Sequence, residues 1–215
     1  MFNKMMKVAL VSGVALAVLA TPAMAGSDVD VFAKERWQFR LRGIGVMPDS
    51  GGHTSINGSP DANDAIVPEF DITYFFTDHV AAELILATSP HDLDLKNSDA
   101  GDLDLGKTMI LPPTLTLQYH FTPDETFSPY VGAGVNYTLP YAEEDGADTN
   151  TLEADGGFGY ALQAGFDYWM NDNWGLNLDV KKVWVDVDAS INSGAITGEV
   201  DLDPWIVGAG VSYRF

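Results

Sequence analysis

The stretch Trp205-Ile206-Val207-Gly208-Ala209-Gly210-Val211-Ser212-Tyr213-Arg214-Phe215 ends the chain and decides its fold. Every second residue from Trp205 to Phe215 is apolar or aromatic, whereas the residues between them are mostly small or polar and include one cation. Because successive side chains of a β-strand point to opposite faces, one face of this strand is apolar. An apolar outer face that ends in aromatic residues is typical of strands in bacterial membrane β-barrels.

The same period of two residues recurs along the chain. Near the start, for example, Trp37, Phe39 and Leu41 alternate with amide and guanidinium side chains. We expect eight strands, at residues 37–42, 70–76, 80–87, 114–121, 131–138, 158–168, 174–181 and 205–215. An even number of antiparallel strands is what a closed barrel of the bacterial type requires.

The connections between these strands alternate in length. Segments 77–79, 122–129 and 171–173 are short, whereas the segments at roughly 47–67, 89–104, 139–156 and 188–199 are long. Short periplasmic turns and long extracellular loops are a mark of transmembrane barrels. The sequence therefore predicts an all-β fold: an eight-stranded antiparallel transmembrane β-barrel with long extracellular loops, short periplasmic turns and both chain ends on the periplasmic side.

A soluble β-sandwich or a lipocalin-like barrel shows the same period of two, with its apolar side chains facing inward. Three features favour the membrane barrel over these folds. Aromatic residues cluster at strand ends, as in Tyr74-Phe75-Phe76 and Tyr168-Trp169. The connection lengths alternate strictly. The second face carries charged and amide side chains with glycine and alanine between them, which suits a lumen.

The first 25 residues have the pattern of a secretory signal peptide. Lys4 and Lys7 precede an apolar segment of 13 residues, Val8 to Ala20, and Ala23-Met24-Ala25 is a small-x-small cleavage site. A helix of 13 residues is too short to cross about 30 Å of hydrocarbon. We expect cleavage after residue 25 and a single transmembrane barrel domain over residues 26–215.

Composition excludes some classes of function. The net charge of the chain is −20, and removal of the signal takes two lysines and no acids, so the mature chain carries −22. Nucleic-acid binding needs clustered Lys and Arg, so we expect no nucleic-acid partner. The chain has no cysteine, so packing and backbone pairing must hold it together after export.

Two irregularities interrupt the pattern. Pro112-Pro113 stands at the start of the fourth expected strand. Proline cannot donate to a β-ladder, so the pair predicts a break in pairing with a neighbouring strand. In the seventh strand the alternation changes at Lys181-Lys182. After this point Val183, Val185 and Val187 fall on the face opposite to that of the preceding apolar residues. We expect a β-bulge there that returns the valines to the outer face.

Longer segments resemble the OmpW/AlkL family of outer-membrane barrels, and together they cover essentially the whole mature chain. They are residues 74–78, 82–84, 111–115, 118–121, 130–138, 203–205 and 210–215. The resemblance implies a protein of the Gram-negative outer membrane with a narrow, largely apolar channel for small hydrophobic molecules. It further implies that the solute leaves sideways through a gap in the wall, and that the carboxyl-terminal Phe215, with Tyr213, is a signal for the barrel-assembly machinery.

The alternation of side chains also predicts a solute path, because it indicates which residues face the lumen. An eight-stranded barrel holds only side chains or one small ligand, which excludes a wide aqueous porin. Pro112-Pro113 would end the ladder near the outer leaflet and allow a lateral opening. The apolar residues at lumen parity are Ile44, Val46, Phe75, Ile85 and Ile206. Taken singly, each of them could simply fill the barrel.

The resemblance also implies a constriction midway along the channel, where Ile85 and Lys181 match the family's positions. Lys181 departs from the apolar pattern. We expect it to be a paired structural lysine near Asp179 and Glu83 rather than a ligand contact.

One alternative is a sealed barrel anchor whose acidic loops bind partners or divalent cations, since such cations take carboxylate oxygens. Ions held there could also bridge the loops to lipopolysaccharide. The acidic segments are Asp92-Leu93-Asp94, Asp102-Leu103-Asp104 and Glu143-Glu144-Asp145. Their spacing matches no defined calcium loop, and a solvated acidic surface explains them more simply, so we expect no metal site.

A second alternative is a membrane enzyme. Its only candidate residues are His53, His79, His91 and His120, which are scattered. None has a Ser or carboxylate partner that spacing reveals. We therefore expect no catalytic site and no cofactor.

Overall fold

The computed structural model describes residues 33–147, 151–191 and 196–215, which belong to one compact unit. The expected signal peptide, residues 1–25, lies outside the described residues, and its cleavage stays a prediction. A short 3-10 helix, η2 (Lys34–Arg36), precedes the first strand. No helix in the described ranges is long and apolar enough to cross a membrane.

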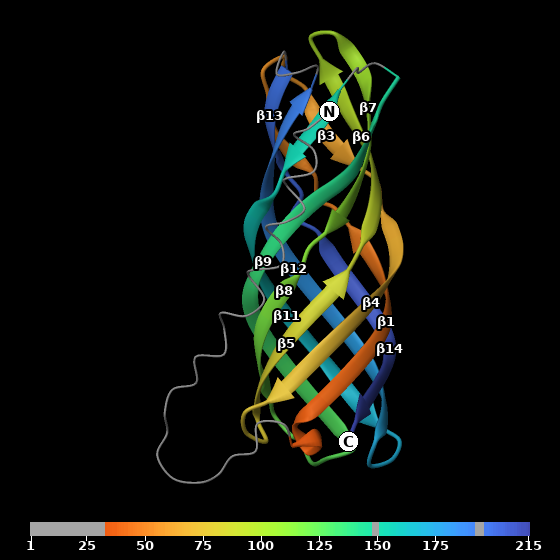
Figure 1. Ribbon diagram of the computed structural model, residues 1–215, viewed down its shortest axis with the longest axis vertical. Coiled ribbons are helices and arrows are strands. Elements are labelled where there is room, and N and C mark those ends of the chain that lie inside the picture. Colours follow the sequence, from red (N-terminus) through yellow and green to blue (C-terminus); the bar gives the residue numbers. More distant parts are fainter. Residues whose placement is uncertain (1–32, 148–150, 192–195) are drawn as a thin grey trace, which may run out of the picture. The chain divides into compact units, whose positions relative to one another are not determined.

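Eight strands close into an antiparallel barrel, as the alternation predicts (Figure 1). In order around the wall they are β1 (Trp37–Met47), β4 (Ala65–Phe75), β5 (Val80–Ala87), β8 (Thr114–His120), β9 (Phe127–Asp145), β11 (Gly157–Trp169), β12 (Trp174–Ile191) and β14 (Trp205–Arg214). Pairing of β14 with β1 closes the barrel. The short turns after β4, β8 and β11 lie at the same end as the carboxyl terminus.

The long connections are not the loops that the sequence predicts, because they contain six further strands. These are β2 (Gly51–Thr54), β3 (Ser59–Ala62), β6 (Ser89–Ser98), β7 (Gly101–Leu111), β10 (Leu152–Asp155) and β13 (Ile196–Asp201). The strands β10, β13 and β2 extend the outer end of β12, while β3, β6 and β7 extend β9. Pairing satisfies the backbone groups of these long segments, so the wall continues outward as two small sheets.

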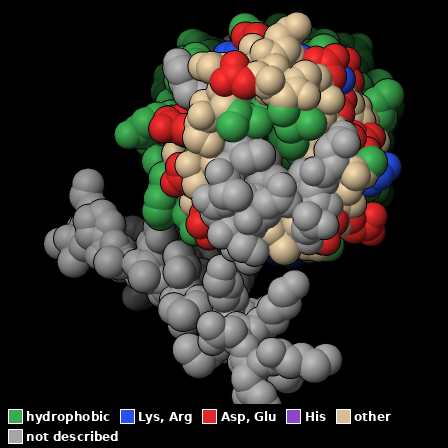
Figure 2. Space-filling model, turned by 90° about the horizontal axis from the view of Figure 1, so that it is seen from above, with side chains coloured by type: hydrophobic (Ala, Val, Ile, Leu, Met, Phe, Trp, Pro, Cys, Tyr) green, Lys and Arg blue, Asp and Glu red, His purple; other side chains and the backbone are tan. Residues whose placement is uncertain are grey.

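The end that carries these sheets is acidic. Seen from above, Asp and Glu side chains are spread around it and Lys and Arg are few (Figure 2). The excess of acids in the sequence is therefore visible on this end of the described structure.

The outer surface of the barrel is apolar. Phe158 is 82% exposed, Tyr160 71% and Leu117 59%, while the alternate residues of the same strands are buried in the lumen. A soluble barrel would place these large side chains inside. The exposure of the apolar face therefore supports the membrane barrel and argues against the soluble alternatives.

The β-bulge expected at Lys181-Lys182 is absent. In β12, Lys181 pairs with Gln163 of β11, Lys182 with Leu162 and Val183 with Ala161, with no shift of register. Val183, Val185 and Val187 consequently face inward and are buried. The expectation was wrong because the lumen is itself apolar at this level, so valines at lumen parity need no correction.

The expected break beside the prolines is present. Pairing of β5 with β8 ends at Ile85 and Thr114, and pairing of β6 with β7 resumes in the same register at Ser89 and Ile110. Between them, residues 86–88 face residues 111–113 without ladder pairs among the described residues. On the other side, the Tyr137 N–H donates to the Pro113 carbonyl at 3.1 Å. The break therefore lies between β5–β6 and β7–β8.

Candidate functional site

A buried charged cluster fills the middle of the lumen. Arg40 lies 2.5 Å from Glu83 and 2.7 Å from Asp167, and Arg42 lies 2.9 Å from Glu69 and 2.7 Å from Asp71. These side chains are at most 2% exposed. We call this cluster the plug, and its members are Arg40, Arg42, Glu69, Asp71, Glu83, Asp167, Asp179 and Lys181.

Neutral side chains complete the plug. Gln118 and Gln163 each donate to Glu83 at 2.7 Å, and Gln38 donates to Asp167 at 3.1 Å. The Tyr130 hydroxyl donates to Asp179 at 2.9 Å. Buried charges are tolerated only when they are paired and hydrogen-bonded in this way. The plug thus joins strands on opposite sides of the lumen and closes the axis of the barrel.

Lys181 belongs to the plug. Its Nζ lies 2.8 Å from Glu69 and 2.9 Å from Asp179. The expected pairing with Asp179 is confirmed, whereas Glu69 takes the place that the sequence assigns to Glu83. Three cations face five carboxylates in the plug, which leaves it acidic.

A polar vestibule of about 300 Å³ lies on the turn side of the plug. The Arg214 guanidinium stacks over Trp169 there at 4.0 Å, and Phe75 and His120 have ring centroids 4.8 Å apart. Phe75 therefore lines the vestibule and not the apolar part of the lumen in which the sequence places it.

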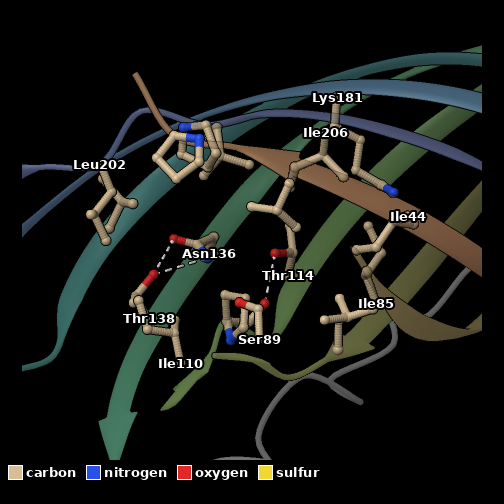
Figure 3. A pocket seen from close by; sticks show the side chains of 18 of the residues that line it. Ile44, Ile85, Ser89, Ile110, Thr114, Asn136, Thr138, Lys181, Leu202 and Ile206 are labelled. Atoms are coloured by element: carbon tan, nitrogen blue, oxygen red, sulfur yellow. Dashed lines mark hydrogen bonds between the residues drawn. The ribbon is translucent and has the colours of Figure 1, made fainter. Parts of the chain in front are cut away.

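An apolar cavity of about 60 Å³ lies on the other side of the plug (Figure 3). Its lining includes five predicted path residues, which are Ile44, Val46, Ile85, Lys181 and Ile206. Pro112 also lines the cavity, while Pro113 is half-buried beside it. The cavity and the break in the ladder therefore share a wall.

The cavity has further lining residues. On the apolar side these are Val67, Val183, Val185 and Leu202. On the polar side they are Ser89, His91, Thr114, Asn136 and Thr138. Thr114, Asn136 and Thr138 face the lumen within the expected strands, and the others lie beyond the bounds of the expected strands. Ser89 and His91 are two residues apart in β6, so they share a face, and Ser89 Oγ lies 2.9 Å from His91 Nε2.

The other histidines make structural contacts. His79 Nδ1 lies 2.7 Å from the His120 carbonyl, and the His79 ring stacks on Tyr119. His120 Nε2 lies 3.1 Å from Gln118 Oε1. The side chain of His53 is outside the described part of the chain.

One of the acidic segments that the sequence singles out, Asp92-Leu93-Asp94, makes two ion pairs with lysines. Asp92 lies 2.8 Å from Lys107, and Asp94 lies 3.1 Å from Lys96. A different group, Asp186, Glu199 and Asp201, brings its carboxylates within 4.8 Å of one another on the outer sheet of β12 and β13. Slight burial raises the pKa of the Asp186 carboxyl above its usual value, and the Asp201 carboxylate raises it further.

The chain matches the family model described as the OmpW family over residues 38–215. It is 44% identical to the uncharacterized outer-membrane protein y4mB of Sinorhizobium fredii, over 94% of this chain and 90% of that protein. It is 30% identical to the dibenzothiophene metabolism operon protein PahQ of Pseudomonas aeruginosa, over 83% and 88% of the two chains. The crystal structure of the outer membrane protein OprG of Pseudomonas aeruginosa matches with a TM-score of 0.77 at 29% identity, over 83% of this chain and 95% of that one.

Proposed function

The chain belongs to the OmpW family of Gram-negative outer-membrane barrels, and from this premise we propose that it passes small hydrophobic molecules across the outer membrane. The solute enters the apolar cavity from the extracellular end and leaves sideways through the wall into the lipid. The observation that carries the proposal is a buried apolar cavity that shares a wall with a break in the strand ladder.

The plug supports a lateral exit. A solute that left along the axis would have to pass paired, desolvated charges, and an apolar molecule gains nothing from replacing them. The route through the wall at Pro112 avoids this cost, because it leads from apolar side chains directly into hydrocarbon.

The size of the cavity implies that its walls move. A cavity of roughly 150 Å³ is needed to hold benzene, whereas this one has about 60 Å³. A solute of that size therefore enters only when side chains on the cavity wall or strands at the break shift apart.

A hydrogen bond crosses the break on the outer face. Thr88 Oγ1 lies 2.6 Å from the Tyr141 hydroxyl. Thr88 stands between Ala87 and Ser89, and both of these neighbours line the cavity. Tyr141 pairs with Met109 of β7, and Ile110, the residue after Met109, also lines the cavity. Both side chains therefore point outward, and their hydrogen bond spans β7, the strand that precedes the prolines.

We expect Tyr141→Phe to increase the uptake of a small hydrophobic solute about fivefold, since one hydrogen bond of about 1 kcal/mol holds the exit closed. Thr88→Val should have the same effect. Uptake of a radiolabelled solute by cells that lack other barrels of this family measures it. Tyr160→Phe, which removes an outward hydroxyl away from the break, is the matched control. Slower uptake in Tyr141→Phe and Thr88→Val would show that the contact does not hold the exit closed.

The direct test of the proposal compares uptake by cells with and without the protein. The sealed-anchor alternative predicts equal rates, and equal rates would refute transport. The plug is compatible with both functions, but an anchor has no need of an apolar cavity beside a broken ladder. The relative named for a dibenzothiophene metabolism operon supports the choice of a small apolar solute as probe.

We also propose that the carboxyl-terminal residues are an assembly signal. Phe215 packs on Phe39 and Tyr213 with ring centroids 6.0 and 5.1 Å apart, at the seam between the first and last strands. A role for lipopolysaccharide as partner remains a prediction. If Phe215 is read by the assembly machinery, Phe215→Ala should lower the amount of folded barrel in the outer membrane, measured by heat-modifiable mobility.

A further inference from the structure

Five polar residues of the cavity lie on one wall. Ser89, His91, Thr114, Asn136 and Thr138 come from the neighbouring strands β6, β8 and β9. The opposite wall is formed by β1, β12 and β14. Apart from Lys181 it is apolar, and it carries Ile44, Val46, Val183, Val185 and Ile206. Figure 3 shows Asn136 and Thr138 beside each other on the side of the cavity away from Ile44 and Ile85.

Asn136 and Thr138 have hydrogen-bonding capacity that the protein does not use. They are 2% and 1% exposed, and within the described residues their side chains hydrogen-bond only to each other, at 3.4 Å in both directions. Such long hydrogen bonds are weak. A carboxamide can donate two hydrogen bonds and accept two more, and buried polar groups normally fill this capacity. Both side chains line the cavity, so a bound molecule can fill it.

The neighbouring side chains offer further acceptors. His91 Nδ1 lies 3.0 Å from the Asn63 carbonyl, which can only accept, so Nδ1 carries the proton and Nε2 accepts from the Ser89 hydroxyl. Thr114 donates to the Pro112 carbonyl at 3.0 Å. The oxygens of Ser89 and Thr114 thus keep free lone pairs on the lining of the cavity.

The charge distribution selects a neutral molecule. Glu69 and Lys181 are the charged residues among those lining the cavity, and they are already paired with each other at 2.8 Å. The plug beneath them holds more carboxylates than cations, which disfavours an anion. An isolated ion in an apolar cavity would also lose its hydration without compensation.

We infer that the cavity is selective for neutral molecules with an apolar body and one hydrogen-bonding group, such as a hydroxyl or a carbonyl. Asn136 and Thr138 bind that group, and the valines and isoleucines of the opposite wall contact the apolar body. The inference rests on the proposed function and names its class of solute.

The test compares two radiolabelled probes, 1-octanol and octane, at concentrations well below saturation, so that uptake follows affinity. Cells express the wild type, Asn136→Leu/Thr138→Val, Thr138→Val alone, or Ser128→Ala. The Leu and Val replacements keep the size of the side chains and remove their hydrogen bonds. Ser128 is buried in the vestibule and serves as a matched control outside the cavity. Heat-modifiable mobility verifies folding, and the single variant serves if the double variant does not fold.

We expect the double variant to lower the ratio of octanol to octane uptake about fivefold, the value of one hydrogen bond, and Ser128→Ala to leave it unchanged. Thr138→Val alone should lower the ratio in the same direction. An unchanged ratio in a folded variant, with wild-type uptake above that of cells without the protein, would overturn this inference and leave the proposed function intact. Wild-type uptake of both probes at the level of cells without the protein would overturn both.

Discussion

Replacement of Ile206 by Trp is expected to reduce the uptake of a small hydrophobic solute to the level of cells that lack the protein. Ile206 lines the cavity from β14 and is 9% exposed. The cavity has about 60 Å³, so an indole placed on its wall leaves no space for a solute. The added bulk also strains the surrounding packing by about 1–3 kcal/mol, which a barrel closed by backbone pairing tolerates.

The next residue provides the control. Val207 lies on the outer face of the same strand and is 46% exposed. Val207→Trp adds the same indole in contact with lipid, where aromatic residues are common in such barrels. Its uptake should equal that of the wild type. Wild-type uptake by a correctly folded Ile206→Trp barrel would exclude the cavity as the route.

Replacement of Arg42 by Met is expected to lower the free energy of unfolding by about 3–5 kcal/mol, because it leaves buried carboxylates without their cation. Arg42 contacts Glu69 and Asp71 directly, and its NH1 lies 3.5 Å from Asp179. Met keeps the apolar stem of the side chain and removes the guanidinium group, so the loss is chiefly electrostatic. Urea unfolding in lipid vesicles measures it.

Lys107→Met removes a cation of a different kind. Lys107 pairs with Asp92 at 2.8 Å, but the two side chains are 67% and 53% exposed. Exposed ion pairs contribute about 0–1 kcal/mol, so this variant should unfold close to the wild type. Equal losses in Arg42→Met and Lys107→Met would show that the plug contributes no more than a surface pair.

The eight barrel strands could be predicted because each strand has one face toward lipid and one toward the lumen, and a period of two reports that difference directly. The outer sheets could not be predicted in the same way. Above the membrane neither face has to be apolar, so strands such as β3 and β10 lack strict alternation. Polar residues and glycines there look like loop sequence although their backbones pair.

The lumen was harder to predict than the wall. Parity places Arg40, Arg42 and Ile44 inside, but it does not say at which height each lies, because strand tilt shifts neighbouring strands along the barrel axis. Phe75 faces the lumen like Ile85 but lies in the vestibule, because it ends β4 beside a turn, whereas Ile85 lies further from that turn in β5. The partners of Arg40 are Glu83 and Asp167, and only the register of the closed barrel brings these distant positions together.

The charges of the plug can pair completely only when the barrel closes. The strand β1 supplies both arginines, while Asp167 comes from β11, which is remote from β1 in an open sheet of the same strand order. Arg40 can therefore meet Asp167 only after the first and last strands have joined at the seam. An incompletely closed or slipped barrel keeps unpaired charges and a hydrated interior, so the finished molecule is electrostatically distinct from its assembly intermediates.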